Sequence, residues 1–252
     1  MRTSVSLIAV VGLVFLLVGC GEKEAPEGEV PPPQVTPKVT PPKVTPPKVT
    51  PPKVAPTKAA PMKADGVLDD AVWKGARELT LTKLEFGEAA NGKTRVLVAY
   101  DQDKLYLAAE CSDDPVTLKN LVADATQHDA DGIWNDDCVE LFIDPTGKRA
   151  TYYQIIINSK GVTWDVYHDS PGSPDHSWEP KYDSTVKVGT DKWVVELAIP
   201  LAAFDRTPER SKTWTFNASR TRTAAGEISF WKAPMDTSSH RPAQFGTLDG
   251  MP

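Results

Sequence analysis

Several patterns that mark common classes of protein are missing from this 252-residue sequence. Its three cysteines form no C-x-x-C-H motif, which excludes covalently attached haem. It has no serine nucleophile elbow, no zinc-binding H-E-x-x-H helix and no glycine-rich phosphate loop. No apolar stripe at helical spacing continues for three turns. These absences argue against several enzyme classes and against a helical fold.

Positive charge is scarce in the larger part of the chain. Of the 28 basic and 34 acidic residues, eight basic and four acidic ones precede Ala64. Residues 64–252 therefore hold 20 basic and 30 acidic residues, a formal net charge of −10. Such a domain repels a phosphate backbone, so nucleic acid is not an expected partner. Neutral ligands and cations are compatible with it.

Long apolar runs are also scarce, and the one at the N-terminus has the length of a signal sequence. The run Val5–Val18 follows Arg2 and is short for a spanning helix, which needs about 20 apolar residues. It predicts a signal peptide over residues 1–19. The ending LVGC resembles the lipobox of bacterial lipoproteins, which implies cleavage before Cys20 and a diacylglycerol on its sulfur. The alternative is a simple secretory signal followed by a chance cysteine.

The next segment, residues 20–63, has the composition of a spacer. Thirteen of the 23 prolines lie between Pro26 and Pro61, within a repeating unit of Val, Thr, Pro and Lys. This composition favours extended polyproline II and cannot bury a core, so we expect a disordered linker before one domain at 64–252. At position 21, glycine and not aspartate follows the cysteine. This resembles the sequence pattern that sorts lipoproteins to the outer membrane of a Gram-negative cell. We therefore expect a lipid-anchored protein of the bacterial envelope, on the periplasmic or surface face.

The pattern of the domain is β throughout. Short alternating runs such as Lys93–Asp101 and Lys104–Cys111 are separated by polar turns, and similar runs continue to Pro234. Asp69–Gly75 and Pro200–Phe204 could each form one short helical turn. Many strands with turn signals and no long helix predict an all-β fold, an antiparallel two-sheet β-sandwich.

Two cysteines remain in the domain after Cys20. Cys111 and Cys138 each lie at the end of an expected strand. In an exported protein such a pair is a disulfide candidate. Small buried thiols are also common at strand ends, so both interpretations remain open.

Seven segments of the domain occur in a recognisable order. They are ADGVLDDAVWKGA, YDQDKLYLAAECSDDP, WNDDCVELFIDP, YYQIIINSKG, WVVELAIPLAAF, WTFNASR and FGTLDG. Together they span nearly all of Asp65–Gly250, and they resemble family 9 carbohydrate-binding modules and their DOMON-like relatives. The resemblance implies a jelly-roll-like sandwich with a sugar-binding cleft on one face and structural calcium. It also implies an association with enzymes of polysaccharide catabolism.

Two positions of the family carry over directly. Its sugar-stacking tryptophan falls on Trp134, and its hydroxyl-binding acid falls on Glu140. An indole covers the apolar face of a pyranose, and a carboxylate accepts hydrogen bonds from its hydroxyls. Six residues of continuous strand would separate the two side chains by ~20 Å, so Trp134 must lie on a loop that folds back. The alternative is that Trp134 packs on the rim and Glu140 faces solvent.

Other positions differ from the family pattern. Gln154, Ile156 and Asn158 share one face of a strand by alternation, and the family's arginine falls on Ile156. The second stacking tryptophan falls near Ser239, beside His240, so the two-tryptophan clamp is not reproduced. Gln154, Asn158 and His240 remain candidate ligand-binding residues.

Several charged residues have two interpretations. Arg220 either points into the cleft as a ligand-binding residue or forms a structural salt bridge. The loop Asp124–Asp137 is rich in carboxylate and amide oxygens, the ligands that calcium prefers. Asp129, Asp131 and Asp136 are its candidate calcium ligands, although exposed acidic loops without a metal are common.

Catalysis and haem binding are weaker interpretations of the same residues. A glycosidase needs two carboxylates ~5–5.5 Å or ~6.5–9.5 Å apart. Asp137 and Glu140 are an odd number of residues apart and face opposite sides of a strand, so we expect no catalytic activity. Some relatives of this sandwich bind haem non-covalently, for which Met235 and His240 would be the axial ligands.

The sequence thus predicts a membrane-anchored lipoprotein that displays a non-catalytic carbohydrate-binding domain. Polysaccharide or oligosaccharide is the expected partner, held by tryptophan stacking and carboxylate hydrogen bonds. A structural or envelope-interaction sandwich that has lost sugar binding is the alternative, followed by a haem-binding relative.

Overall fold

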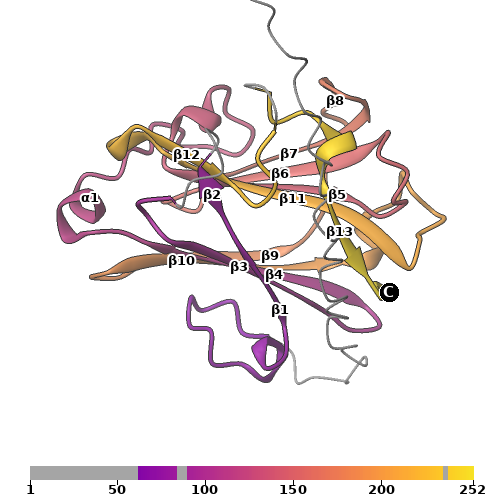
Figure 1. Ribbon diagram of the computed structural model, residues 1–252, viewed down its shortest axis with the longest axis horizontal. Coiled ribbons are helices and arrows are strands. Elements are labelled where there is room, and N and C mark those ends of the chain that lie inside the picture. The colour runs from indigo at the N-terminus through magenta and orange to yellow at the C-terminus, as the bar shows by residue number, and fades with distance from the viewer. Residues whose placement is uncertain (1–61, 84–89, 235–237) are drawn as a thin grey trace, which may run out of the picture. The chain divides into compact units, whose positions relative to one another are not determined.

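The structure is a computed structural model that describes residues 62–83, 90–234 and 238–252 (Figure 1). The expected signal peptide, Cys20 and nearly all of the linker lie outside these residues. Across the described ranges, no helix is both long enough and apolar enough to cross a bilayer.

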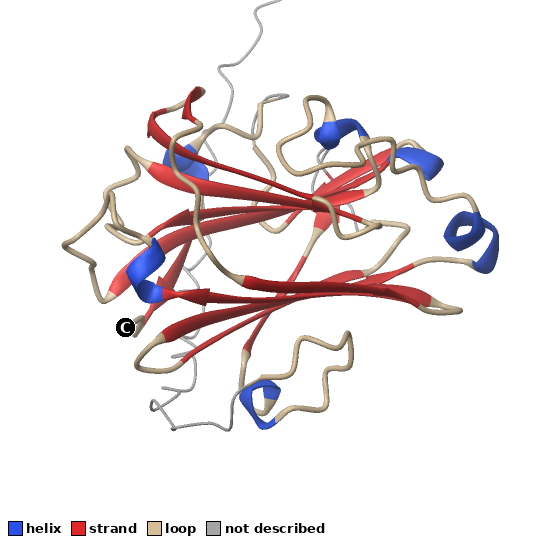
Figure 2. Ribbon diagram, turned by 180° about the vertical axis from the view of Figure 1, so that it is seen from behind, coloured by secondary structure: helices blue, strands red, loops and turns tan. Residues whose placement is uncertain are grey.

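Two antiparallel sheets lie face to face, as Figures 1 and 2 show. The smaller sheet has the strand order β1-β3-β4-β10-β9. Its strands are β1 (Arg77–Thr80), β3 (Thr94–Tyr100), β4 (Lys104–Ser112), β9 (Asp183–Val188) and β10 (Lys192–Pro200). The two expected runs that begin at Lys93 and Lys104 are therefore β3 and β4, which pair with each other as antiparallel neighbours.

The larger sheet has the order β2-β12-β11-β5-β6-β7-β8, and β13 pairs with β11 as well. Its strands are β2 (Thr82–Lys83), β5 (Cys138–Asp144), β6 (Tyr152–Asn158), β7 (Thr163–Ser170), β8 (Ser173–Asp175), β11 (Thr213–Arg222), β12 (Glu227–Phe230) and β13 (Gly246–Asp249). The predicted all-β two-sheet sandwich is confirmed.

Helical segments are short and lie in the connections between strands (Figure 2). They are α1 (Pro115–Lys119) and the 3₁₀ turns η1 (Ala71–Trp73), η2 (Ile133–Asn135), η3 (Leu201–Ala203), η4 (Thr223–Ala225) and η5 (Pro242–Gln244). The turns η1 and η3 confirm the two short helical turns expected from the sequence.

The core lies between the sheets and follows the alternation of the strands. Val139, Leu141 and Ile143 of β5 point inward and pack with Leu107 of β4 and Leu197 of β10 in one buried cluster. Each fully buried aliphatic side chain stabilises the fold by about 1.5–3 kcal/mol. The odd-numbered residues of β5 therefore belong to the core, which leaves its even-numbered residues on the outer face.

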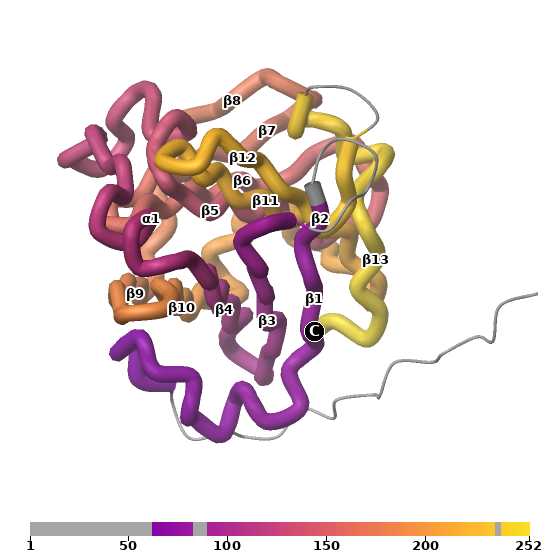
Figure 3. Tube along the Cα trace, turned by 60° about the vertical axis from the view of Figure 1, so that its left-hand side comes forward, coloured from indigo at the N-terminus to yellow at the C-terminus, as the bar shows by residue number. Residues whose placement is uncertain are grey.

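The segment before β1 covers the outside of the smaller sheet (Figures 1 and 3). Trp73 packs there with Tyr106 and other apolar residues. Glu196 of β10 is buried beneath this segment and accepts hydrogen bonds from Gly66 N at 2.7 Å and from Trp73 Nε1 at 3.0 Å. These bonds fix the segment that opens the domain to the middle of the sheet.

A buried group of charges joins the two sheets at one end of the core. Arg220 of β11 is 0% exposed and contacts Asp113 in an ion pair, and its Nη1 lies 3.1 Å from Thr94 Oγ1 of β3. Arg222 donates through Nε to Asp113 Oδ1 at 2.9 Å and through Nη1 to Glu227 Oε1 at 2.9 Å. The guanidinium of Arg220 lies between the sheets, so its prediction as a ligand-binding residue is wrong and the salt-bridge alternative holds.

Replacing Asp113 by asparagine should lower the stability of the domain sharply. The change leaves the guanidiniums of Arg220 and Arg222 buried without their shared anion, and breaking a buried pair costs about 3–5 kcal/mol. Urea unfolding of the full chain measures this difference.

The matched control is Glu78→Gln, which breaks the exposed pair of Glu78 with Arg95, 3.2 Å apart. Exposed pairs contribute about 0.2–1 kcal/mol. Equal losses from the two substitutions would contradict a structural role for the buried group.

Candidate functional site

The outer face of the larger sheet carries a row of polar side chains among apolar ones. Glu140 lies on this face of β5, opposite Ser219 of β11. Gln154 of β6 and His168 of β7 lie on the same face, by the alternation that places their neighbours in the core. All four side chains are buried, and Glu140 retains 8% exposure.

Three of these side chains form a chain of hydrogen bonds. Gln154 donates through Nε2 to Glu140 Oε2 at 2.9 Å, and its Oε1 lies 2.8 Å from His168 Nε2. Because the amide oxygen can only accept, Nε2 of His168 carries the proton. Nδ1 of His168 is then an acceptor, and it is buried without a hydrogen-bond partner. The row therefore contains a nearly buried carboxylate and a buried ring nitrogen without a hydrogen-bond partner.

Burial shifts the pKa values of both ends of this chain. Loss of water raises the pKa of Glu140 to about 7, and the hydrogen bond from Gln154 offsets only part of this shift. Burial, with the nearby His240 and His176, lowers the pKa of His168 to about 3. His168 is consequently neutral at physiological pH, whereas Glu140 changes charge near neutrality.

Trp134 marks one end of the row. It lies in the turn η2, is 44% exposed, and meets Trp164 of β7 edge to face, with ring centroids 6.0 Å apart. Gly132, with φ of 86°, begins the turn in a conformation that favours glycine. The loop that carries Trp134 therefore folds back over the sheet, as the spacing between Trp134 and Glu140 requires.

The acidic residues after Trp134 hold this loop in place. Asp136 accepts from Asp124 N at 2.8 Å and from Asn158 Nδ2 at 2.9 Å. Asp137 accepts from Val122 N at 2.6 Å. These carboxylates replace water as acceptors for buried amides, so they position the indole without themselves facing a ligand.

Aromatic rings close the other end of the row. His240 Nδ1 lies 2.7 Å from the hydroxyl of Tyr152, and Phe245 packs against Tyr152 and Phe142. The ring of His168 stacks on Tyr152 with centroids 4.4 Å apart. His240 thus lies on the predicted face, held by the ring cluster. Met235, the other candidate haem ligand, lies outside the described residues.

Four of the six predicted ligand-binding residues lie on one face with no structural role that rules out a ligand contact, and the other two are engaged in bonds within the protein. Trp134, Glu140, Gln154 and His240 share the outer face, and their roles in binding stay predictions. Asn158 is on this face but fully buried, and its amide bonds Asp136, Ala125 O, Lys160 N and Val162 N. Asn158 is therefore a support of the Trp134 loop, which corrects its prediction as a ligand contact. Arg220 faces the core.

His168 is the member of the row that sequence reasoning did not assign to the face. Its signal was present in the alternation of β7, where Trp164, Val166 and His168 point to one side. Only the register of β7 on β6, which places His168 opposite Tyr152, shows that this side is the one that carries Gln154.

One further prediction does not match the structure. Asp136 accepts hydrogen bonds from backbone amides and from Asn158. Asp129 lies with His128 and Asp165 instead. The predicted calcium ligands Asp129, Asp131 and Asp136 are therefore not brought together.

Cys111 and Cys138 are both buried and free. Cys111 faces the core between the sheets, whereas Cys138 packs on the outer face. The sheet separates the two sulfurs, so of the two open interpretations the structure supports buried free thiols and not a disulfide.

The fold and this face define a β-sandwich whose larger sheet presents a polar row flanked by aromatic rings. Residues 64–249 match the family described as "Carbohydrate family 9 binding domain-like", and the chain belongs to this family.

Two curated relatives each match about three quarters of this chain. Endo-1,4-beta-xylanase A of Thermotoga maritima is 26% identical over 190 residues, which span 73% of this chain and 16% of the xylanase. The chain thus matches a small part of that enzyme's length.

Solved structures share the fold at low identity. A family 9 carbohydrate-binding module from Caldicellulosiruptor kristjanssonii in complex with cellotriose has a TM-score of 0.53 at 16% identity, over 76% of this chain and 90% of that module. The module in complex with glucose has a TM-score of 0.54 at 16% identity, over 76% and 92%. These likenesses establish the sandwich fold of the domain.

Substituting Glu140 by glutamine should remove one pH dependence of stability. A carboxyl with a raised folded-state pKa stabilises the fold below its unfolded value of 4.5, and this stability is lost as the pH rises through about 7. Between pH 4.5 and 8, the free energy of unfolding of Glu140→Gln should rise by about 2–3 kcal/mol relative to that of the original chain. Urea unfolding across this range measures the gain.

His168→Gln provides the opposite slope as a control. The folded-state pKa of His168 is lowered, so the stability that His168 contributes to the domain is present above pH 6.5 and is lost as the pH falls toward 3. The variant should flatten the acidic side of the profile alone. Parallel profiles for Glu140→Gln and the original chain would contradict the burial of an ionisable carboxyl in the row.

Proposed function

We propose that the outer face of the larger sheet holds a glycan, with Trp134 as the stacking platform and Glu140 as the acceptor for sugar hydroxyls. The observation that carries this proposal is an exposed indole beside a nearly buried row of hydrogen-bonding groups. Large exposed aromatic side chains next to ordered polar groups are typical of ligand sites. Membership of a family of carbohydrate-binding domains supports the proposal.

The chemistry of the row suits a sugar. A pyranose has one apolar face, which the indole of Trp134 would cover, and hydroxyls at its edge. Glu140, which retains 8% exposure, would accept from a hydroxyl in a charge-assisted bond.

The direction of approach follows from what covers the face. Phe245 and His240 pack over the end of the row at Phe142 and Tyr152, while Trp134 is the exposed end. A ligand would therefore meet Trp134 first and extend toward Glu140. Glucose, cellotriose and the xylan fragments suggested by the relatives are suitable probes.

The domain is proposed to bind without catalysis. Asp136 and Asp137, the carboxylates that precede Glu140 in sequence, accept hydrogen bonds from backbone amides. They are thus engaged in holding the loop and are not available as the second carboxylate that glycoside hydrolysis needs. Such a domain would concentrate its carrier, or a partner enzyme, on a polysaccharide.

A sandwich that has lost sugar binding remains the second candidate. Asn158 and Arg220 are both committed to internal bonds, and Ile156 occupies the position of the family's arginine. These features remove polar groups from the face. A titration with saccharides separates the two candidates, because only the first requires binding at Trp134.

We also propose that the mature chain is anchored to the bacterial envelope by the lipid on an acylated Cys20. The support is the LVGC ending of an apolar run followed by a proline-rich spacer. Each buried acyl CH₂ contributes ~0.8 kcal/mol, so several chains together give a stable anchor.

Trp134→Ala should weaken saccharide binding by about tenfold or more, because losing the stacking surface removes about 1.4 kcal/mol. Calorimetric titration of the full chain with glucose, cellotriose and xylotriose measures this change. Glu140→Gln should weaken binding more at pH 8 than at pH 6, because the original carboxyl is itself largely neutral at the lower pH.

Val188→Ala is the control, since Val188 is an exposed apolar residue of β9 in the other sheet. Its affinity should equal that of the original chain. Failure of every saccharide to bind, or unchanged binding by Trp134→Ala, would favour the candidate without sugar binding.

Cys20→Ser should abolish incorporation of fatty acid into the protein in an expressing Gram-negative cell and leave the signal peptide uncleaved. Serine has no thiol to accept the diacylglycerol, so neither acylation nor lipoprotein processing can follow. Labelling with a radioactive fatty acid reports the outcome. Incorporation of the fatty acid into the Cys20→Ser chain would disprove the proposed anchor.

A further inference from the structure

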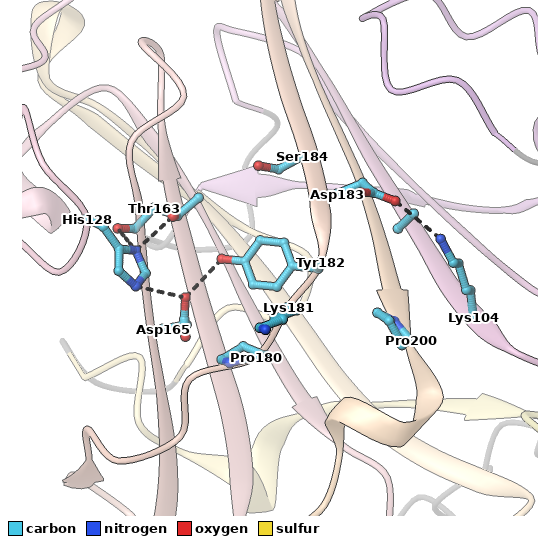
Figure 4. Close-up of a pocket in the computed structure, with 11 residues that line it drawn as sticks. Lys104, His128, Thr163, Asp165, Pro180, Lys181, Tyr182, Asp183, Ser184 and Pro200 are labelled. Atoms are coloured by element: carbon cyan, nitrogen blue, oxygen red, sulfur yellow. Dashed lines mark hydrogen bonds and ion pairs between the residues drawn. The ribbon is translucent and has the colours of Figure 1, made fainter.

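A cavity of about 550 Å³ lies on the other side of β7, away from the polar row (Figure 4). Asp165 and Thr163 of β7 line one wall, and Tyr182 and Asp183, at the start of β9, line the opposite wall. His128, from the loop between α1 and η2, lies at its edge. The cavity therefore brings together the two sheets and the loop that carries Trp134.

Four ionisable side chains converge at this edge. Nε2 of His128 lies 3.5 Å from Asp129 Oδ2, 3.9 Å from Asp165 Oδ2 and 3.4 Å from Glu179 Oε2. The nitrogen and the carboxylate oxygens of His128, Asp129 and Asp165 all lie within 4.8 Å of one another. Three carboxylates thus surround one imidazole nitrogen, which leaves a negative excess even if the ring is protonated.

The orientation of His128 turns this nitrogen toward the carboxylates, where its long hydrogen bond to Glu179 Oε2 at 3.4 Å is the contact that a metal ion would replace. Its Nδ1 lies 3.0 Å from both the carbonyl oxygen and Oγ1 of Thr163 (Figure 4), and because the carbonyl can only accept, the tautomer with a proton on Nδ1 satisfies that contact. In the neutral ring, the lone pair on Nε2 then points at the carboxylates. Metal-bound histidines commonly donate their other ring N–H to a backbone carbonyl in this way.

Asp165 supplies an independent sign of a missing partner. The residue is 1% exposed, and its Oδ1 is buried without a hydrogen bond. Its Oδ2 accepts from the hydroxyl of Tyr182 at 3.0 Å, as Figure 4 shows. A buried carboxylate oxygen without a partner is unfavourable unless a cation or a donor completes it.

Asp129 is held in a conformation that directs it to the same point. Its backbone has φ of 58°, a region that only glycine, asparagine and aspartate adopt readily. Its Oδ1 accepts from Asp165 N at 3.3 Å, which leaves Oδ2 facing His128. The local strain is compatible with a functional position.

From this arrangement we propose that His128, Asp129 and Asp165 bind a single divalent transition-metal ion of the zinc class. Zinc–ligand bonds of about 2.0–2.1 Å in a tetrahedron place neighbouring ligand atoms about 3.3 Å apart. The distances of 3.5 and 3.9 Å from Nε2 need only small adjustments. Calcium takes 6–8 oxygen ligands and does not favour an imidazole nitrogen.

The fourth coordination position is open to Glu179 or to water. Glu179 is exposed and already contacts His128, so its side chain can turn inward. The ion would join the loop that carries Trp134 to β7, since His128 and Asp129 belong to that loop and Asp165 to the strand. The site is therefore separate from the proposed sugar contacts but supports the loop that presents them.

Zinc titration of the full chain, stripped of metal and carrying no polyhistidine tag, tests this proposal. Calorimetry should show one zinc ion bound per chain, and zinc at a hundredfold excess over Kd should raise the melting temperature by roughly 5 °C or more. Cobalt should give the visible absorption of a four-coordinate site. Calcium at the same concentration should produce neither effect.

Two substitutions locate the ion without disturbing the fold. His128→Gln changes an exposed side chain, and Asp129→Asn keeps a residue that tolerates the positive φ. Each should weaken zinc binding by at least about tenfold and remove the melting shift. His176→Gln, which removes an exposed imidazole elsewhere, should bind zinc as the original chain does.

Absence of zinc binding, or zinc binding that His128→Gln leaves intact, would overturn the proposal. Loss of binding in His176→Gln instead would place the ion elsewhere and overturn it as well. Saccharide titration of the same His128→Gln protein is a separate measurement, so a failure of the metal site is distinguishable from a failure of the sugar face.

Discussion

The larger sheet is covered on both faces, and this constraint governs the rest of the domain. Every residue of β5 and β6 is buried, although only their odd-numbered residues face the core. A polar side chain on either face must therefore find a partner inside the protein or leave a binding group unused.

Neighbouring residues of β11 point to opposite faces of the sheet and therefore have different roles. Arg220 points between the sheets and shares Asp113 with Arg222, which makes it part of the core. Ser219, its neighbour, points outward and lies opposite Glu140. On the outer face the chain of bonds from Glu140 through Gln154 to His168 leaves Nδ1 of His168 without a partner.

The acidic loop before β5 also divides its side chains between two tasks. Asp136 and Asp137 bind backbone amides and keep Trp134 over the sheet. Asp129 turns the other way, toward His128 and the buried carboxyl of Asp165. Trp164 and Asp165, adjacent on β7, point to opposite sides of the strand, so the proposed sugar face and the proposed cation site share one strand and one loop without overlapping.

Alternation and turn signals were sufficient to predict the sandwich, because the period of two and the polar turns are local properties of the chain. They also placed Glu140 and Gln154 on one side of their strands, and the spacing to Trp134 required the loop that the structure contains. Side-chain partners were not predictable in the same way. Arg220 was misassigned because its role depends on which face of its strand meets the other sheet, and the choice between a disulfide and free thiols for Cys111 and Cys138 depended on the same fact. Asn158 lies on the expected face, but its amide bonds to residues that are distant in sequence.

The sequence by itself determined the β class, the acidic character of the domain and the residues that alternate along each strand. Only the tertiary structure decided which of the two faces became the core, because that depends on strand register and on what packs above the sheet. For the same reason it alone brought His168 beside Gln154, and Asp165 beside His128, across gaps of 14 and 37 positions in the chain. Local patterns do not encode such distances, whereas packing and hydrogen bonding between distant strands do.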